Sequence, residues 1–351
     1  MTQSEQRRIQ KSGRSSFVIT LPMDWVTSNK LKVGDLLTIE RASDGTLKIR
    51  TLEIKEPKES VYKIKIESAD DVNRIEPIII ACFVAGFDRI EITWNKVLSL
   101  SDLKELKRVT EKTLIKCTGM GIISESDSQI IIKSFVDSTK SVIFEGIYNR
   151  ITERVKKILK NSTLHFYSGE YICTAEDCET LENDINKIYN QLMREIFVLL
   201  SDNGTLNETG KMNYKQLTEL RLFAKYLEEI AEHGLRLCEI NQNLSKDGFI
   251  KKYKTLLVKI GEQLIITYEE LIKNFPNVKI KDTWKNTEVI TVLQNHHKTL
   301  MSEVSQEKNG KIRQYTQLHY ELDQIINLLK TINEISLTYN IVAGQMGSNS
   351  E

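Results

Sequence analysis

The chain has 351 residues, of which 40% are hydrophobic and 28% are charged, and its formal net charge is +1. These values are typical of a globular protein. They exclude a disordered chain and a chain that is strongly basic over its whole length. Its four prolines and 16 glycines are few, which favours a mainly α-helical, multidomain architecture. No apolar run approaches the roughly 18 residues of a membrane-spanning helix, and the basic N-terminus lacks the apolar core of a signal peptide.

The cysteine pattern argues against a secreted, disulfide-bonded protein, and the absence of catalytic motifs argues against an enzyme. The five cysteines are an odd number and contain no Cys-x-x-Cys pair: Cys82, Cys117, Cys173, Cys178 and Cys238. We therefore expect small core residues in a reducing cytoplasm rather than disulfides or a zinc ribbon. The chain has no Gly-x-Ser-x-Gly, no His-Glu-x-x-His and no glycine loop that opens a helix, so we expect no enzymatic activity.

The first 50 residues read as a small β-rich module. Alternating residues predict a strand over 17–21 that ends at Pro22, since proline cannot donate to a sheet. A short helix over 23–30 follows, and then two strands over 36–40 and 46–50 joined by an Asp-Gly turn. From Glu5 to Arg50 the segment has nine cationic and five acidic side chains. This locally basic module is predicted to be a domain over 1–52.

The same residues resemble a known family. Lys-Ser-Gly-Arg at 11–14, the strand ending Leu-Pro and the later Leu-Lys-Val-Gly-Asp at 31–35 resemble the AbrB/SpoVT-type swapped-hairpin domain. The resemblance implies a small barrel built by two chains, which binds DNA. A module of this size buries too little core to be stable alone, which also indicates a homodimer.

DNA binding by this module would depend on contacts with phosphates. Phosphate neutralisation is expected from four cations, and two hydroxyls would act as further donors. The alternative interpretation is a surface hairpin with incidental charges. The predicted DNA-binding residues are Arg7, Arg8, Lys11, Arg14, Ser15 and Ser16.

Residues 53–138 are predicted to be a linker followed by a small α+β segment. Residues 52–60 read as the linker, and alternating residues at 61–67 and 87–94 predict strands. A helix capped by Ser101 and Asp102 follows, and two further strands are expected over 119–125 and 129–135. The predicted order is therefore β-α-β-α-β-β.

From residue 139 onward the apolar residues have a helical period. Six helices are expected, the first ending near 159 and the others covering 172–200, 214–241, 249–274, 284–305 and 311–343. Their order predicts two three-helix bundles, over 139–245 and 246–345.

Acidic residues on two successive helices of the first bundle suggest a metal site. Glu228 and Glu232 are four residues apart and share a helix face, and Glu182 and Asp184 lie on the preceding helix. Carboxylates from adjacent helices can hold a divalent or iron-group cation. A solvated acidic face is the alternative, so no cofactor is certain.

The stretch from Phe223 to His233 resembles the helix signature of PhoU-like proteins, roughly Ala-x-x-Leu-Glu-Arg-Ile-Ala-Asp-His. The resemblance implies paired three-helix bundles that can bind iron-group metal clusters and act in phosphate signalling. Lys330 and Ile335 stand where the second bundle would carry an acid and a histidine, so that bundle is degenerate. His165, His233 and His319 are interpreted as surface or packing residues.

The complete order resembles archaeal PhoU-like regulators of phosphate uptake that carry an AbrB-type domain. We therefore expect a cytoplasmic, DNA-binding transcription regulator whose bundles sense a signal or dock a partner. The alternative is an adaptor that controls a phosphate transporter or signalling complex through protein contacts, without sequence-specific DNA binding. Neither interpretation involves insertion into a membrane.

Overall fold

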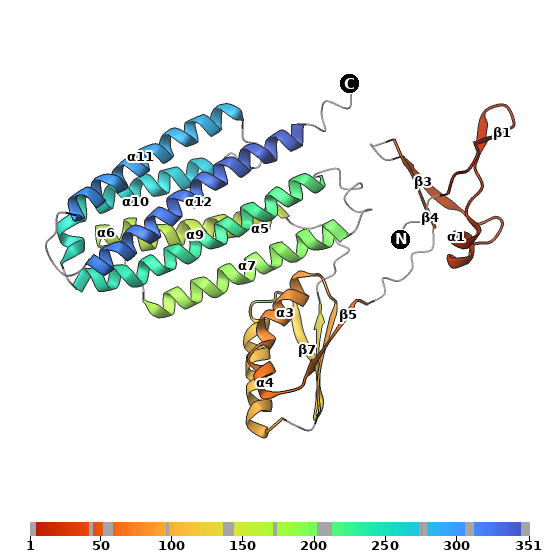
Figure 1. The fold of residues 1–351 in the computed structure, drawn as a ribbon, viewed down its shortest axis with the longest axis horizontal. Coiled ribbons are helices and arrows are strands. Elements are labelled where there is room, and N and C mark those ends of the chain that lie inside the picture. Colours follow the sequence, from red (N-terminus) through yellow and green to blue (C-terminus); the bar gives the residue numbers. More distant parts are fainter. Residues whose placement is uncertain are drawn as a thin grey trace. The chain divides into compact units, whose positions relative to one another are not determined.

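The computed structural model describes residues 5–41, 45–51, 59–95, 98–135, 144–170, 174–201, 213–246, 248–273, 275, 279–305 and 312–344. It consists of two units, Met1–Lys58 and Glu59–Glu351 (Figure 1). Most of the expected linker and the tip of the Asp-Gly turn lie outside the described residues. So does the C-terminal tail.

The first unit contains two antiparallel hairpins and a short helix. The elements are β1 (Gln10–Ser12), β2 (Ser16–Val18), α1 (Met23–Ser28), β3 (Leu37–Arg41) and β4 (Leu47–Thr51). Gly13 has a φ of 70° at the first turn, a conformation that side chains disfavour. The predicted strand over 17–21 is shorter than expected, since regular pairing ends at Val18.

The two hairpins of this unit form two separate two-stranded sheets. None of its described residues is buried, and apolar side chains are exposed on both hairpins. Examples are Ile9, Phe17, Ile39 and Leu47. A single copy of the unit therefore has no hydrophobic core of its own among the residues that the structure describes.

The second unit begins with a four-stranded mixed sheet. The order along the chain is β5 (Val61–Ile66), α2 (Ala69–Val72), α3 (Ile75–Val84), β6 (Arg89–Trp94), α4 (Leu100–Leu114), β7 (Met120–Ser126) and β8 (Gln129–Ser134). This confirms the predicted β-α-β-α-β-β order. The strands are arranged β5-β6-β8-β7, with β5 and β6 parallel, and α3 and α4 cover one face (Figure 1).

Helix α4 starts earlier than predicted. Its N-cap is Ser99, whose hydroxyl accepts from the backbone N–H of Asp102, while the Asp102 carboxylate accepts from the backbone N–H of Ser99. This reciprocal pair is a capping box, in which the residue three positions after the cap reaches back. The expected cap at Ser101 is therefore wrong by two residues.

The remainder of the second unit is helical. The helices are α5 (Phe144–Ser162), α6 (Leu164–Ser168), α7 (Ala175–Ser201), α9 (Tyr214–Lys246), α10 (Phe249–Lys273), α11 (Ile280–Val304) and α12 (Ile312–Gly344). The long helices lie alongside one another (Figure 1), as the helical period predicts. Among the described residues, none of the helices has the length and apolarity that crossing a membrane requires.

The buried residues of these helices form one continuous hydrophobic cluster that runs from Ile147 to Tyr339. Helices α9 and α12, from the two expected bundles, contact each other directly. The Asn213 amide, just before α9, donates to the carbonyl of Val342 at 3.2 Å. The predicted boundary at 245–246 falls at the very end of α9 rather than between two helices, and the two halves share a core.

Arg194 of α7 joins the helices to the α+β segment. Its side chain is 2% exposed, and its guanidinium donates to the carbonyls of Phe83 and Phe87 at 2.7 and 3.2 Å. These carbonyls lie at and just beyond the end of α3, where backbone acceptors lack intrahelical partners. No local pattern in the sequence marks this residue, because its partners lie more than 100 positions away.

Candidate nucleic-acid interface and polar cluster of the helices

The β1–β2 hairpin presents the predicted DNA-binding residues to solvent. Lys11 pairs with Phe17 across the hairpin, and Ser12 pairs with Ser16. Arg14 and Ser15 occupy the turn between the strands. All six predicted residues are exposed; they are Arg7, Arg8, Lys11, Arg14, Ser15 and Ser16.

The Arg7 guanidinium forms an ion pair with the Glu5 carboxylate. Within the described residues, Arg8, Lys11 and Arg14 have no such carboxylate partner. Arg8 lies just before β1, and Lys11 and Arg14 lie on the hairpin. Exposed cations of this kind can contact phosphates of a nucleic acid, and such contacts carry affinity without reading bases. The exposed cations therefore fit a surface that binds the phosphate backbone of a nucleic acid.

A pocket of about 450 Å³ lies beside this hairpin in the same unit. Its lining is largely apolar and includes Ile19, Leu21, Trp25, Leu47 and Ile49. This pocket adds to the exposed apolar surface of a unit whose described residues form no core. The apolar surface of this unit is therefore suited to contact with a partner chain.

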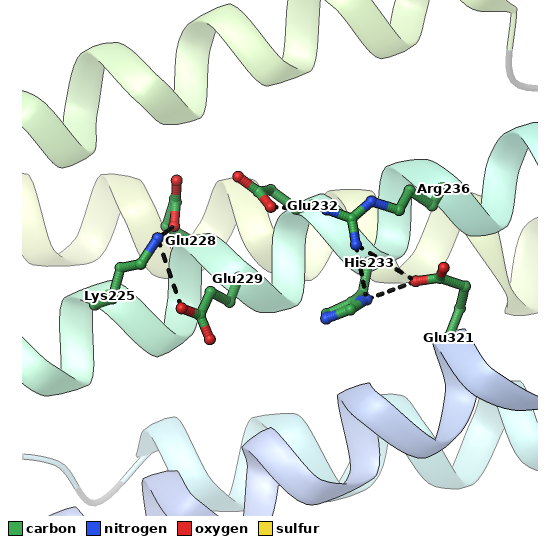
Figure 2. Close-up of polar contacts among 7 residues, drawn as sticks. All are labelled: Lys225, Glu228, Glu229, Glu232, His233, Arg236 and Glu321. Atoms are coloured by element: carbon green, nitrogen blue, oxygen red, sulfur yellow. Dashed lines mark hydrogen bonds and ion pairs between the residues drawn. The ribbon is translucent and has the colours of Figure 1, made fainter. Parts of the chain in front are cut away.

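The predicted acidic residues of α9 are held by cations of the same helix (Figure 2). The Lys225 ammonium lies 2.5 Å from the Glu228 carboxylate and 3.6 Å from that of Glu229. One turn later, Arg236 donates to Glu232 at 3.0 Å. These pairs have the spacing of three or four residues at which helical side chains meet.

Glu228 differs from its neighbours because it is 6% exposed. Burial raises the pKa of the Glu228 carboxyl, the charge of Glu232 adds to the increase, and the Lys225 ammonium opposes it. Burial and the negative charge of Glu228 also raise the pKa of Tyr189 on α7. Glu228 therefore faces α7 in a poorly solvated position.

A contact between α9 and α12 completes this cluster. The His233 ring donates from Nδ1 to the Glu321 carboxylate at 2.5 Å, and Arg236 lies 3.9 Å from the same carboxylate (Figure 2). Glu321 is buried, with 7% of its surface exposed. His233 was interpreted as a surface or packing residue, and the sequence contains no local signal for a partner 88 positions away.

Of the four predicted metal ligands, Glu228 and Glu232 interact with each other, but Glu182 and Asp184 do not join them. Glu182 is exposed on α7, and Asp184 forms an ion pair with Arg154 of α5 at 3.1 Å. Over the described ranges, no three His, Cys, Asp or Glu side chains are placed so that they could hold a metal ion. A cation bound by Glu228 and Glu232 would have to displace Lys225 and Arg236.

Two segments of the chain match family models. Residues 10–60 match the family described as antidote-toxin recognition MazE, bacterial antitoxin. Residues 148–240 match the PhoU domain, which leaves α10, α11 and α12 beyond the matched range. No curated protein shows a significant match to the chain.

Among solved structures, the chain is similar to PhoU from Pseudomonas aeruginosa. The sequence identity is 14% and the TM-score is 0.45, over 57% of this chain and 94% of that chain. The MazE match covers most of the first unit and extends to residue 60, just inside the second unit, whereas the PhoU match lies wholly in the second unit. The chain thus has an N-terminal segment that is similar to the MazE antitoxin family and a later helical segment that is similar to the PhoU domain.

Proposed function

We propose that the protein is a DNA-binding transcription regulator of phosphate uptake or homeostasis. The N-terminal unit binds DNA, and the PhoU helices serve as the sensor or as the surface that docks a partner. The observation that carries this proposal is the exposed β1–β2 hairpin, with Arg8, Lys11 and Arg14 unpaired among the described residues. The MazE and PhoU matches support the two halves of the assignment.

The N-terminal unit acts as a homodimer in this proposal. Its described residues include no buried side chain, and its exposed apolar side chains surround a pocket of about 450 Å³. A second copy would cover this surface, and burial of apolar area is the main favourable term in such an association. Pairing would also place two basic hairpins in one DNA-binding surface.

The test compares the full chain with an Arg8→Ala/Arg14→Ala double variant. Binding to a duplex from a phosphate-transport promoter and to an unrelated duplex is measured by fluorescence anisotropy across a salt series. Each lost phosphate contact reduces the slope of log affinity against log salt by about 0.9. We expect a decrease of about 2 if one chain binds and about 3–4 if two chains bind.

Lys63→Ala/Lys65→Ala is the matched control, because it removes two exposed cations from β5 in the other unit. It should leave both the affinity and the salt slope unchanged. Equal slopes for the wild type and the Arg8/Arg14 variant would remove the hairpin from the DNA interface.

A second candidate function is an adaptor that controls a phosphate transporter or signalling complex through protein contacts. It is favoured by Arg7, whose charge is already neutralised by Glu5, and by the PhoU domain in the larger unit. It predicts no DNA binding at any salt concentration, together with recovery of a transporter or signalling subunit on the purified full chain.

A further inference from the structure

An open groove between α11 and α12 lies beyond the residues that match the PhoU domain. Its volume is about 460 Å³, and its lining includes His297, Met301, His319 and Asp323. It is separate from the acidic residues of α9, because it is built from two other helices. Two of the five histidines of the chain meet in it.

The two imidazoles face each other across the helix pair. Nε2 of His297 and Nδ1 of His319 are 3.0 Å apart, and the ring centroids are 4.8 Å apart. His297 is 4% exposed, whereas His319 is half-buried at the groove. One ring must donate an N–H to the other, so this contact uses one nitrogen lone pair.

The same separation suits two ligands of one metal ion. With zinc–nitrogen bonds of about 2.0–2.1 Å, two nitrogens on a tetrahedral zinc lie roughly 3.3–3.4 Å apart. The observed distance of 3.0 Å requires a change of only a few tenths of an ångström. Because the imidazoles come from different helices, a small adjustment between α11 and α12 is enough.

Charged side chains of both signs line the groove beside the pair. Asp323 contributes a carboxylate to this lining, and Lys298 contributes an ammonium. The Asp323 carboxylate also accepts a hydrogen bond from Asn327 at 2.9 Å, which holds it in position.

We propose that His297 and His319 bind one borderline transition-metal dication of the zinc class between α11 and α12. Nε2 of His297 and Nδ1 of His319 each form one bond to the metal ion. The proton that lies between these two nitrogens in the free protein moves to the other nitrogen of the ring that carries it. Among the described residues no third His, Cys, Asp or Glu completes the site, so water from the groove occupies the remaining positions. Imidazole ligands select zinc, nickel or copper over magnesium and calcium, which prefer oxygen.

The bound ion would link the two helices about two turns from the segment that joins them. That link would stabilise the C-terminal helix pair without involving Glu228 or Glu232. The site is therefore independent of the acidic residues that the sequence suggested as metal ligands.

The experiment measures Zn²⁺ binding to chelator-treated full chain by equilibrium dialysis with elemental analysis. The wild type, His297→Gln and His319→Asn are compared, with His296→Gln as the control. His296 is the adjacent residue, and neighbouring helical positions point about 100° apart. We expect one Zn²⁺ per wild-type chain and per control chain, and at least a tenfold loss of affinity in the other two variants.

His319→Asn keeps the experiment informative if His297→Gln fails to fold, because His319 is only half-buried. Circular dichroism of each variant checks its folding, and Mg²⁺ should show no binding above background. No Zn²⁺ uptake by the wild type, or equal uptake by His319→Asn, would show that the pair is only a hydrogen bond and would overturn the proposal.

Discussion

Glu228 shows how single residues set the chemistry of α9. Its carboxylate is buried against α7, and the ammonium of Lys225 lies 2.5 Å away. Glu232 has a cation partner of its own in Arg236. The two glutamates, which suggest a cation site in the sequence, are therefore already paired with cations of the same helix. Glu228 loses more of its solvation than Glu232, because it is the buried one of the two.

Replacing Glu228 by Gln should change how stability depends on pH. The folded-state pKa of Glu228 is raised above its usual 4.5, so the folded protein holds this proton more tightly than the unfolded chain. The resulting stabilisation is complete below about pH 4.5 and is lost as the pH rises through the folded pKa. Over a series from pH 4 to 8, Glu228→Gln should therefore gain stability relative to wild type once the pH exceeds about 4.5, and the gain should level off above the folded-state pKa.

Thermal unfolding across this pH range provides the measurement. Glu182→Gln is the control, since Glu182 is exposed on α7 and should give a curve parallel to that of wild type. Parallel curves for Glu228→Gln as well would mean that burial does not affect this carboxyl.

At the scale of elements, close approach of helices fixes the packing of the second unit. A Cβ on Gly261 of α10 would lie 2.8 Å from the backbone nitrogen of Leu164 and 2.9 Å from its Cα. Residue Leu164 begins α6, so α6 and α10 approach each other backbone to backbone at this glycine. Gly234 of α9 is less restrictive, because its nearest neighbour is a side-chain atom of Ile158 at 2.7 Å.

Gly261→Ala should therefore destabilise the protein by about 1–3 kcal/mol, the usual cost of overpacking. This is opposite to the gain of up to about 1 kcal/mol that alanine normally gives in a helix. Gly234→Ala should cost less, since a side chain can move more easily than a backbone. Urea unfolding compares the two variants, and a Gly261→Ala protein as stable as wild type would contradict the α6–α10 contact.

At the scale of the whole molecule, the two units differ in whether the described residues of one copy form a hydrophobic core. The second unit has two buried clusters, one in the sheet segment and one among the helices. The described part of the first unit has no buried side chain. The described part of one copy thus has no core of its own, and the self-association that we propose would supply a buried surface.

An Ile39→Asp/Leu47→Asp variant should weaken self-association of the full chain by at least tenfold. These two side chains are 63% and 64% exposed, and a buried unpaired carboxylate would be costly at an apolar interface. Light scattering coupled to size exclusion measures the mass. Val292→Asp, on the exposed surface of α11, should behave as wild type. A wild-type chain that is monomeric at all concentrations would refute the dimer.

The sequence by itself determined the long helices, the strands and their order, but it did not predict the short helix α6. Apolar periods predicted the long helices and the β-α-β-α-β-β segment, because periodicity depends only on neighbours along the chain. The cations at positions 7–14 were equally visible, since their exposure follows from their charge. The cap of α4 was misplaced because Asp102 reaches back three residues, and either Ser99 or Ser101 is a suitable capping residue.

Only the tertiary structure decided which side chains meet. His233 contacts Glu321 across 88 positions, and His297 contacts His319 across 22. Arg194 reaches carbonyls of the α+β segment, and α9 packs on α12 within one core. Such pairs depend on how helices cross and which residues face the contact, and a residue pattern within one helix does not contain that information. The sequence therefore supplies the basic hairpin and the helices, whereas the packed helices bring the histidine pair together.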